Sequence, residues 1–292
     1  MTPQDFAFLR DMLRERSGLV LSDDKSYLVE SRLQPVAKSN GLNGLPELIT
    51  SLRKPGSENL KSQITEAMTT NESFFFRDKI PFQNFEEHML PYMLQARAAK
   101  KKLRIWSAAA STGQESYSLS IILKEMAPKL TGWKVDIIGT DLSIEVLEKA
   151  SAGLYSQFEV QRGLPVNLMV KYFKQIGSLW QIDASIRSMV EYKSFNLLDN
   201  LSPLGQFDIV FCRNVLIYFD QATKADVLKR ISRQMENDAY LILGAAETIV
   251  GLCDDFKMVE GRRGLFQKVS AGQSTRHSSL SDAISSSFAV SK

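Results

Sequence analysis

The spacing of hydrophobic positions changes partway along the chain. In the first 85 residues apolar side chains recur every three or four positions, as Phe6, Leu9 and Leu13 do, which is the period of a helix with one buried face. This pattern predicts helices over 5–16, from 23 or 24 towards 40, over 46–52 and over 58–68. Pro35 falls inside the second of these and is expected to kink or restart it. Residues 1–85 therefore predict a small all-α domain.

From residue 103 onward short apolar runs alternate with helical stretches, which is typical of a mainly parallel sheet covered by helices. We expect sheet strands at 103–106, 135–139, 190–198, 207–212 and 239–244, and a closing hairpin from 256–261 and 264–269. An irregular insert at 153–187 contains a second hairpin around Gly177 and Ser178. The fold class is α/β: a Rossmann-like sheet over 103–269 with a small β-subdomain insert, preceded by the helical domain and a linker helix at 86–102. The serine-rich tail, 270–292, has too few apolar residues to fold alone.

The first two strands frame candidate ligand chemistry. The run LRIWSAAASTGQES is a strand, a loop of small residues and a helix start that carries Glu115, and VDIIGTD ends the next strand on Asp141. A carboxylate in the place of Asp141 can accept hydrogen bonds from both ribose hydroxyls of a nucleoside. No G-x-G-x-x-G or phosphate loop is present, and Glu115 would repel a pyrophosphate but attract an ammonium group. S-adenosylmethionine fits this pattern. The alternative is that Glu115 only complements a helix N-terminus and that Asp141 caps the next helix.

Further polar residues follow other strands. In an open α/β sheet the ligand crevice lies outside the carboxyl ends of the strands. The polar side chains at the ends of the strands predicted at 190–198 and 207–212 are therefore expected to reach the same ligand: Asn196, Arg213, Asn214 and Tyr218. The segment TTNESFFFRD, 69–78, lies at the junction of the two domains. Its aromatic rings can instead be core residues, and Arg77 can instead pair locally with Asp78.

Composition argues against several classes of function. The net charge of +3 is too small to indicate nucleic-acid binding. No run of eighteen apolar residues and no signal peptide is recognisable, and the two cysteines lack metal or redox spacing. With only two histidines, a histidine-based triad or a metal site is not expected. We therefore expect a cytoplasmic protein without a metal.

Five motifs, TTNESFFFRD, RIWSAAASTGQESYSL, GTDLS, FNLLD and FCRNVLIYF, resemble in order and spacing those of the CheR chemotaxis receptor methyltransferases, over nearly all of residues 1–269. The resemblance implies a class I S-adenosylmethionine-dependent methyltransferase that converts glutamate side chains of bacterial chemoreceptors to methyl esters for chemotactic adaptation. It implies a cofactor site formed by Asn71, Ser73, Arg77, Glu115, Asp141, Asn196, Leu197, Arg213 and Asn214. Arg77 and Tyr218 are the implied catalytic residues, nearest the transferred methyl group.

The chain departs from the family pattern at a few positions. Ser73 replaces a threonine and keeps the hydroxyl, Ala110 replaces a common cysteine, and Gln114 and Ser116 replace the usual glutamate and proline on either side of Glu115. Two alternatives remain: a non-catalytic scaffold that binds S-adenosylmethionine, and a methyltransferase with another substrate. Against the second, the loop after residue 212 lacks the Asn/Asp-Pro-Pro-aromatic sequence of base N-methylation.

The resemblance also predicts the partner, which is the glutamate-rich cytoplasmic helices of methyl-accepting receptors. A basic face of Lys25, Arg32 and Lys38 is expected to dock them, unless it is an ordinary solvated surface. Family members that bind a pentapeptide at the receptor C-terminus tend to have a longer, glycine-richer loop in the insert. The connection at Gly177 and Ser178 is short, so the resemblance favours action without that pentapeptide. The expected state is a monomer.

Overall fold

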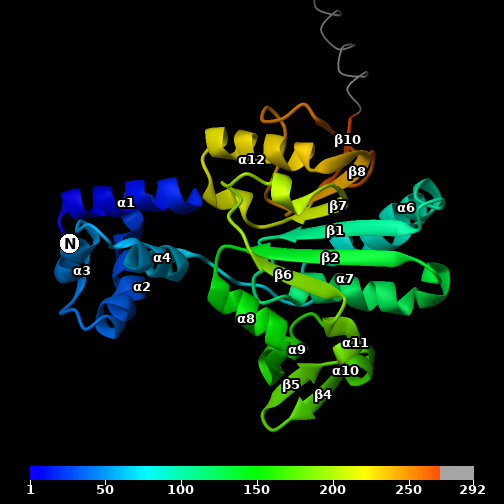
Figure 1. Cartoon of the computed structure of the whole chain (residues 1–292), viewed down its shortest axis with the longest axis horizontal. Coiled ribbons are helices and arrows are strands. Elements are labelled where there is room, and N and C mark those ends of the chain that lie inside the picture. The colour runs from blue at the N-terminus through cyan, green and yellow to red at the C-terminus, as the bar shows by residue number, and fades with distance from the viewer. Residues whose placement is uncertain (270–292) are drawn as a thin grey trace, which may run out of the picture.

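The computed structural model describes residues 1–269, so the expectation for the tail at 270–292 lies outside the described residues. The described chain forms a helical domain, a connecting segment (residues 69–79), and a larger α/β domain with a small β-subdomain on one side (Figure 1).

The helical domain contains the four helices that the apolar spacing predicts: α1 (Pro3–Ser17), α2 (Ser26–Ser39), α3 (Leu45–Leu52) and α4 (Glu58–Met68), with a 3₁₀ turn, η1 (Asp23–Lys25), before α2. Thr2 and Asp5 form a capping box at the start of α1, and Gly18 ends it with a φ of 74°. Leu9, Leu13 and their apolar neighbours on the other helices form the core. Pro35 does not restart the second helix, because α2 runs through it.

The α/β domain is built on a seven-stranded sheet of order β6-β2-β1-β7-β8-β10-β9. Its strands are β1 (Lys102–Ala108), β2 (Lys134–Asp141), β6 (Val190–Ser194), β7 (Phe207–Cys212), β8 (Met235–Leu243), β9 (Phe256–Met258) and β10 (Leu265–Lys268). The first five in spatial order are parallel, and β10 and β9 add the predicted antiparallel hairpin. The chain places β2 on one side of β1 and β7 on the other, which makes their carboxyl ends the expected position of a ligand crevice.

Two apolar layers cover the sheet. On one face, Trp106 of β1 packs with Val227 and Leu228 of α12 (Gln221–Arg233). On the other face, Ile105 packs with Leu119 of α7 (Gln114–Glu125) and with residues of the helical stretch at 80–96. That stretch consists of α5 (Ile80–Asn84), the π-helical turn η2 (Phe85–Met89) and α6 (Leu90–Ala96). The helix after β2 is α8 (Ile144–Ala152). The domain also contains three short 3₁₀ turns: η3 (Ala127–Leu130), η4 (Ser202–Leu204) and η5 (Leu216–Tyr218).

The insert forms the predicted β-subdomain. It consists of β3 (Leu154–Ser156), α9 (Gln157–Gln161), α10 (Val166–Tyr172), β4 (Phe173–Ile176), β5 (Leu179–Ile182) and α11 (Ala184–Arg187). The hairpin around Gly177 and Ser178 is confirmed, since Ile176 pairs with Leu179. Phe75 of the connecting segment belongs to its core, with its ring 5.1 Å from that of Tyr155.

Two strand boundaries differ from the sequence prediction. The strand predicted over 190–198 ends at Ser194. Residues 196–199 form a turn instead, in which the Asp199 N–H donates to the Asn196 carbonyl, and Leu197 is buried in the core. The strand predicted from 239 begins at Met235, whose side chain is buried although the next residues are polar. Within residues 1–269 the helices are all too short or too polar to cross a membrane.

Candidate functional site

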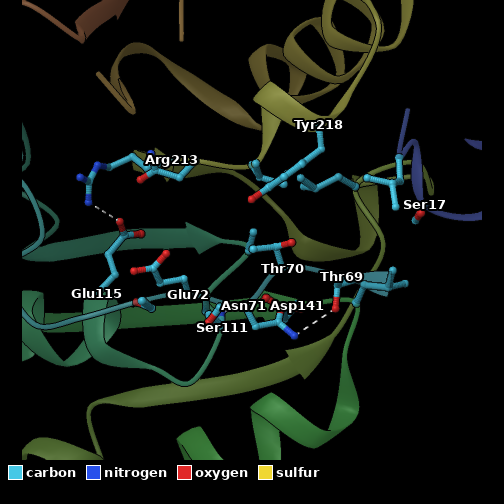
Figure 2. A pocket seen from close by; sticks show the side chains of 18 of the residues that line it. Ser17, Thr69, Thr70, Asn71, Glu72, Ser111, Glu115, Asp141, Arg213 and Tyr218 are labelled. Carbon is cyan, nitrogen blue, oxygen red and sulfur yellow. Dashed lines mark hydrogen bonds and ion pairs between the residues drawn. The ribbon is translucent and has the colours of Figure 1, made fainter. Parts of the chain in front are cut away.

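A pocket lies between the helical domain, the connecting segment and the carboxyl ends of the central strands (Figure 2). It contains about 1020 Å³ of empty space, part of which is open to solvent. All of the sequence-predicted site residues line it: Asn71, Ser73, Arg77, Glu115, Asp141, Asn196, Leu197, Arg213, Asn214 and Tyr218. Ser17 and Leu19 of the helical domain also line it and were not predicted.

Asp141 ends β2 and is buried. Its Oδ2 accepts a hydrogen bond of 2.8 Å from the Ser111 N–H, and its Oδ1 accepts one of 3.0 Å from the Ser143 N–H. Burial raises the pKa of the Asp141 carboxyl, and the backbone hydrogen bonds partly oppose this shift. The capping alternative is wrong, because the N-cap of α8 is Ser143, whose hydroxyl accepts from the Val146 N–H. Each carboxylate oxygen keeps acceptor capacity for a ribose hydroxyl.

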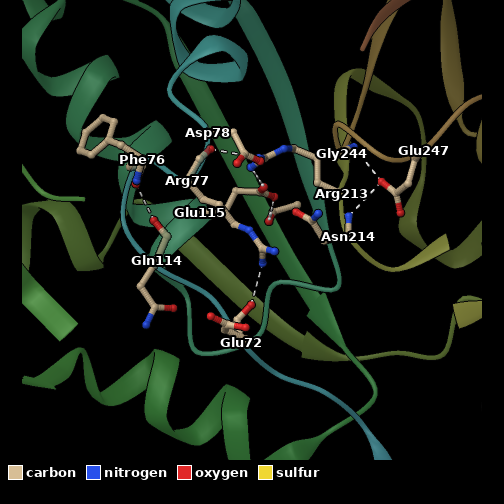
Figure 3. A network of polar contacts seen from close by, with 12 residues as sticks. Glu72, Phe76, Arg77, Asp78, Gln114, Glu115, Arg213, Asn214, Gly244 and Glu247 are labelled. Atoms are coloured by element: carbon tan, nitrogen blue, oxygen red, sulfur yellow. Dashed lines mark hydrogen bonds and ion pairs between the residues drawn. The ribbon is translucent and has the colours of Figure 1, made fainter. Parts of the chain in front are cut away.

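Glu115 and Arg213 form an ion pair in the interior of the site (Figure 3). Glu115 Oε2 lies 2.8 Å from Arg213 Nη1, and its Oε1 accepts a hydrogen bond of 2.8 Å from the Ser107 hydroxyl. Arg213 Nη2 also donates to Asp78 Oδ2 at 2.6 Å and to the Arg77 carbonyl at 3.0 Å. The Arg213 side chain is 2% exposed, so this strand end fixes both α7 and the connecting segment. Its Nε has no hydrogen-bond partner among residues 1–269.

Arg77 does not make the local pair with Asp78 that was the alternative interpretation, since Asp78 binds Arg213. Its Nη1 instead donates to the Glu72 carbonyl at 2.8 Å. The guanidinium carbon lies 5.6 Å from the centre of the Phe74 ring. Of the three aromatic rings, Phe75 and Phe76 pack in cores as the alternative proposed, whereas Phe74 lines the pocket.

Two polar residues of the pocket attach the helical domain to the sheet. The Asn196 amide donates to the carbonyl of Arg16 at 2.6 Å, and its oxygen accepts from the Leu198 N–H at 3.0 Å. The backbone carbonyl of Tyr218 accepts a hydrogen bond of 2.9 Å from the Val20 N–H. The end of α1 and the loop after it are thus hydrogen-bonded to the segments that follow β6 and β7.

Glu247 does not line the pocket but holds a loop that does, and the sequence analysis missed it. Its carboxylate accepts four backbone hydrogen bonds of 2.7–3.0 Å, from Asn214, Val215, Leu216 and Gly244. It therefore fixes the loop after β7 that carries Asn214, whose φ is 58°. Such a conformation is costly for a residue other than glycine and is common at functional sites. Its position after β8, another strand that ends at this sheet edge, was the available signal.

The sheet order, the buried acid that ends β2 and the acid at the start of α7 indicate the class: an S-adenosylmethionine-dependent methyltransferase. Residues 4–69 match the family model "CheR methyltransferase, all-alpha domain", and residues 71–265 match "CheR methyltransferase, SAM binding domain". The chain belongs to the CheR methyltransferase family, as the sequence motifs predicted, and is a methyltransferase of chemotactic adaptation.

Named relatives span nearly the whole chain. It is 39% identical over 265 residues to chemotaxis protein methyltransferase Cher2 of Pseudomonas putida, covering 89% of this chain and 96% of that one. It is 40% identical over 268 residues to chemotaxis protein methyltransferase 1 of Pseudomonas aeruginosa, covering 90% and 97%. A chemotaxis protein methyltransferase of Salmonella typhimurium is 33% identical over 258 residues, covering 87% and 86%. Within residues 1–269 no group of three or more His, Cys, Asp or Glu side chains is arranged to hold a metal ion.

Proposed function

We propose that this protein transfers the methyl group of S-adenosylmethionine to glutamate side chains on the cytoplasmic helices of bacterial chemoreceptors, forming methyl esters. The observation that carries the proposal is the Arg77 guanidinium at the pocket wall, with one nitrogen hydrogen-bonded to the Glu72 carbonyl. A guanidinium so placed can hold a substrate carboxylate. None of the side chains that line this pocket is a histidine, lysine or cysteine, and a glutamate nucleophile does not need one.

The residues present fit the cofactor. Asp141 keeps acceptor capacity for the ribose hydroxyls, and the Glu115 carboxylate can accept from the ammonium group beside its bonds to Ser107 and Arg213. The other proposed cofactor contacts are Asn71, Ser73, Arg77, Asn196, Leu197, Arg213 and Asn214. When bound, S-adenosylmethionine supplies a methyl group attached to a positively charged sulfur.

The remaining chemistry is alignment. A glutamate with an ordinary pKa of about 4.3 is ionised near neutrality, so the enzyme does not have to remove a proton. Arg77 holds one carboxylate oxygen and leaves the other free to attack, and the Tyr218 hydroxyl donates a hydrogen bond that orients the carboxylate. Because the reaction turns a carboxylate and a sulfonium into neutral products, a pocket that excludes water favours it.

The helical domain is proposed to dock the acidic receptor helix. Lys25 and Lys38 are exposed and available for this. Arg32 has another task, because its guanidinium donates to the carbonyls of Met68 and Thr69 at 2.7 and 2.8 Å. We propose a docking face of Lys25 and Lys38, with Arg32 holding the connecting segment. We further propose that the protein acts as a cytoplasmic monomer, needs no metal or receptor pentapeptide, and does not bind nucleic acid or insert into membranes.

The domain division is also a proposal. Met68 is the last residue of the helical core, and Phe75, Phe82 and Phe85 already pack with the α/β domain and its insert. We place the boundary near residue 70, ahead of the expected 85, with the catalytic domain continuing to 269.

Mass spectrometry of purified receptor cytoplasmic fragments tests the function. After incubation with enzyme and S-adenosylmethionine, peptides with receptor glutamates should gain the mass of one CH2 unit, because a methyl group replaces the carboxyl hydrogen. Fragments with glutamine at those positions should not. Cofactor binding without transfer to any receptor fragment would support the scaffold alternative instead.

A further inference from the structure

A third arginine, Arg162, lies against two residues that line the pocket. Arg162 follows α9 of the β-subdomain, and its Nη2 lies 2.5 Å from Glu72 Oε1. Its guanidinium carbon is 4.4 Å from the centre of the Phe74 ring, over which Arg77 also lies at 5.6 Å. Glu72 and Phe74 line the pocket. Arg162 and Arg77 thus reach the same short stretch of the connecting segment from different elements.

The backbone fixes this arrangement. Gly163, next to Arg162, has a φ of +86°, and a Cβ there would lie only 2.0 Å from the carbonyl oxygen of Phe75. Phe75 in turn is fully buried among β-subdomain residues, including Tyr155 and Phe173. The position of Arg162 relative to the segment that carries Arg77 is therefore set by close packing, while its side chain remains 40% exposed.

Glu72 is a carboxylate in the field of both arginines. The pKa of its carboxyl is lowered first by the hydrogen bond and charge of Arg162 and further by the charge of Arg77. The Glu72 side chain is 58% exposed, and exposed ion pairs contribute little to stability. A carboxylate from another molecule can therefore replace Glu72 on Arg162 at small cost.

We propose that Arg162 is a specificity-determining residue that binds a second carboxylate of the substrate helix, on the turn next to the methylated glutamate, and that Glu72 occupies Arg162 when no substrate is bound. This inference rests on the proposed function. Since the guanidinium carbons of Arg162 and Arg77 lie 4.4 and 5.6 Å from one ring centre, they are at most about 10 Å apart. Successive turns of a helix are about 5.4 Å apart, so two carboxylates on one helix face can reach both arginines.

The test compares variants whose expected effects have opposite sign. With a receptor cytoplasmic fragment as substrate, Arg162→Ala should lower kcat/KM about threefold to tenfold, mainly through KM. Glu72→Gln, which frees Arg162, should raise kcat/KM about twofold. The affinity of both variants for S-adenosylhomocysteine should equal that of the wild type. Lys149→Ala is the matched control, because Lys149 forms an exposed pair with Glu159 of α9 away from the pocket.

A substrate variant completes the test. In a receptor fragment whose acidic neighbours one turn from the methylated glutamates are changed to glutamine, Arg162→Ala should cause no further loss, which is a coupling that a double-mutant cycle detects. If Glu72→Gln lowers kcat/KM as Arg162→Ala does, and the exchange Glu72→Arg with Arg162→Glu restores it, the pair is structural and the inference is wrong. An unchanged kcat/KM in Arg162→Ala also overturns it. If the wild type itself does not methylate the receptor fragment, the proposed function fails instead.

Discussion

The Glu66 carboxylate of α4 accepts a hydrogen bond of 2.6 Å from the Ser143 hydroxyl. The same Oε1 accepts the N–H of Glu145 at 3.0 Å. The last helix of the helical domain thus holds the start of α8, whose N-cap, Ser143, is two residues after Asp141. Because the Ser143 N–H is itself a hydrogen-bond donor to Asp141, the helical domain and the proposed ribose site are connected through one serine.

Glu66→Ala should therefore weaken binding of S-adenosylhomocysteine, by about threefold to tenfold in a calorimetric titration, the equivalent of one modest hydrogen bond. Glu148→Ala is the control, because Glu148 is an exposed residue of α8, the helix that Glu66 contacts. Equal affinity in the wild type and Glu66→Ala would show that the contact does not support the cofactor site.

The raised pKa of Asp141 predicts a pH dependence of cofactor binding. Ribose hydroxyls need the ionised carboxylate, and burial and the charge of Glu66 both favour its protonated form. As pH falls, affinity for S-adenosylhomocysteine should therefore drop at a higher pH than the ordinary aspartate pKa of about 3.9 would give. Glu66→Gln removes a negative charge and should move the drop to lower pH. A drop that does not move in Glu66→Gln would contradict the assignment to Asp141.

Glu247→Ala should destabilise the protein by about 2–4 kcal/mol, because four backbone N–H groups lose their acceptor. Glu247→Gln keeps one acceptor oxygen and should cost less. Urea unfolding measures the change, with Glu260→Ala as an exposed control. A loss no larger than that of Glu260→Ala would mean that solvent replaces the carboxylate.

Gly163→Ala should destabilise the β-subdomain contact by about 3 kcal/mol or more, since its Cβ would meet the Phe75 carbonyl. Gly177 also has a positive φ, of +61°, but has open space around it. Gly177→Ala should therefore cost only the backbone strain, about 1–2 kcal/mol. Thermal unfolding of the two variants compares them, and similar melting temperatures would argue against close packing at Gly163.

Arg77→Ala should lower kcat about a hundredfold while the affinity for S-adenosylhomocysteine changes less than threefold, because alignment of the carboxylate is lost whereas Arg77 is only one of many proposed cofactor contacts and the others remain. Single-turnover methylation and calorimetry measure the two quantities separately. Equal losses in rate and affinity would show that Arg77 serves chiefly to bind cofactor.

The sequence predicted the βαβ unit, the order of elements and six pocket residues, Glu115, Asp141, Asn196, Arg213, Asn214 and Tyr218, because those features depend on local periodicity and on the rule that strand ends meet. The other four, Asn71, Ser73, Arg77 and Leu197, came from the resemblance to the CheR family. It did not predict features that depend on contacts between distant segments. Arg32 has the sequence environment of a solvated basic residue, yet its partners are the carbonyls of Met68 and Thr69, 36 and 37 residues away. Likewise, the position of Glu247 after β8 places it at the sheet edge of the site, but does not indicate that its carboxylate accepts hydrogen bonds from residues 31–33 positions earlier.

The most direct test of the central claim uses S-adenosylmethionine with a labelled methyl group and chemoreceptor cytoplasmic fragments, followed by mild alkali. If the enzyme esterifies glutamate side chains, the fragments should become labelled and alkali should release the label as methanol. Label that stays on the fragment after alkali treatment would identify a different linkage and contradict glutamate esterification.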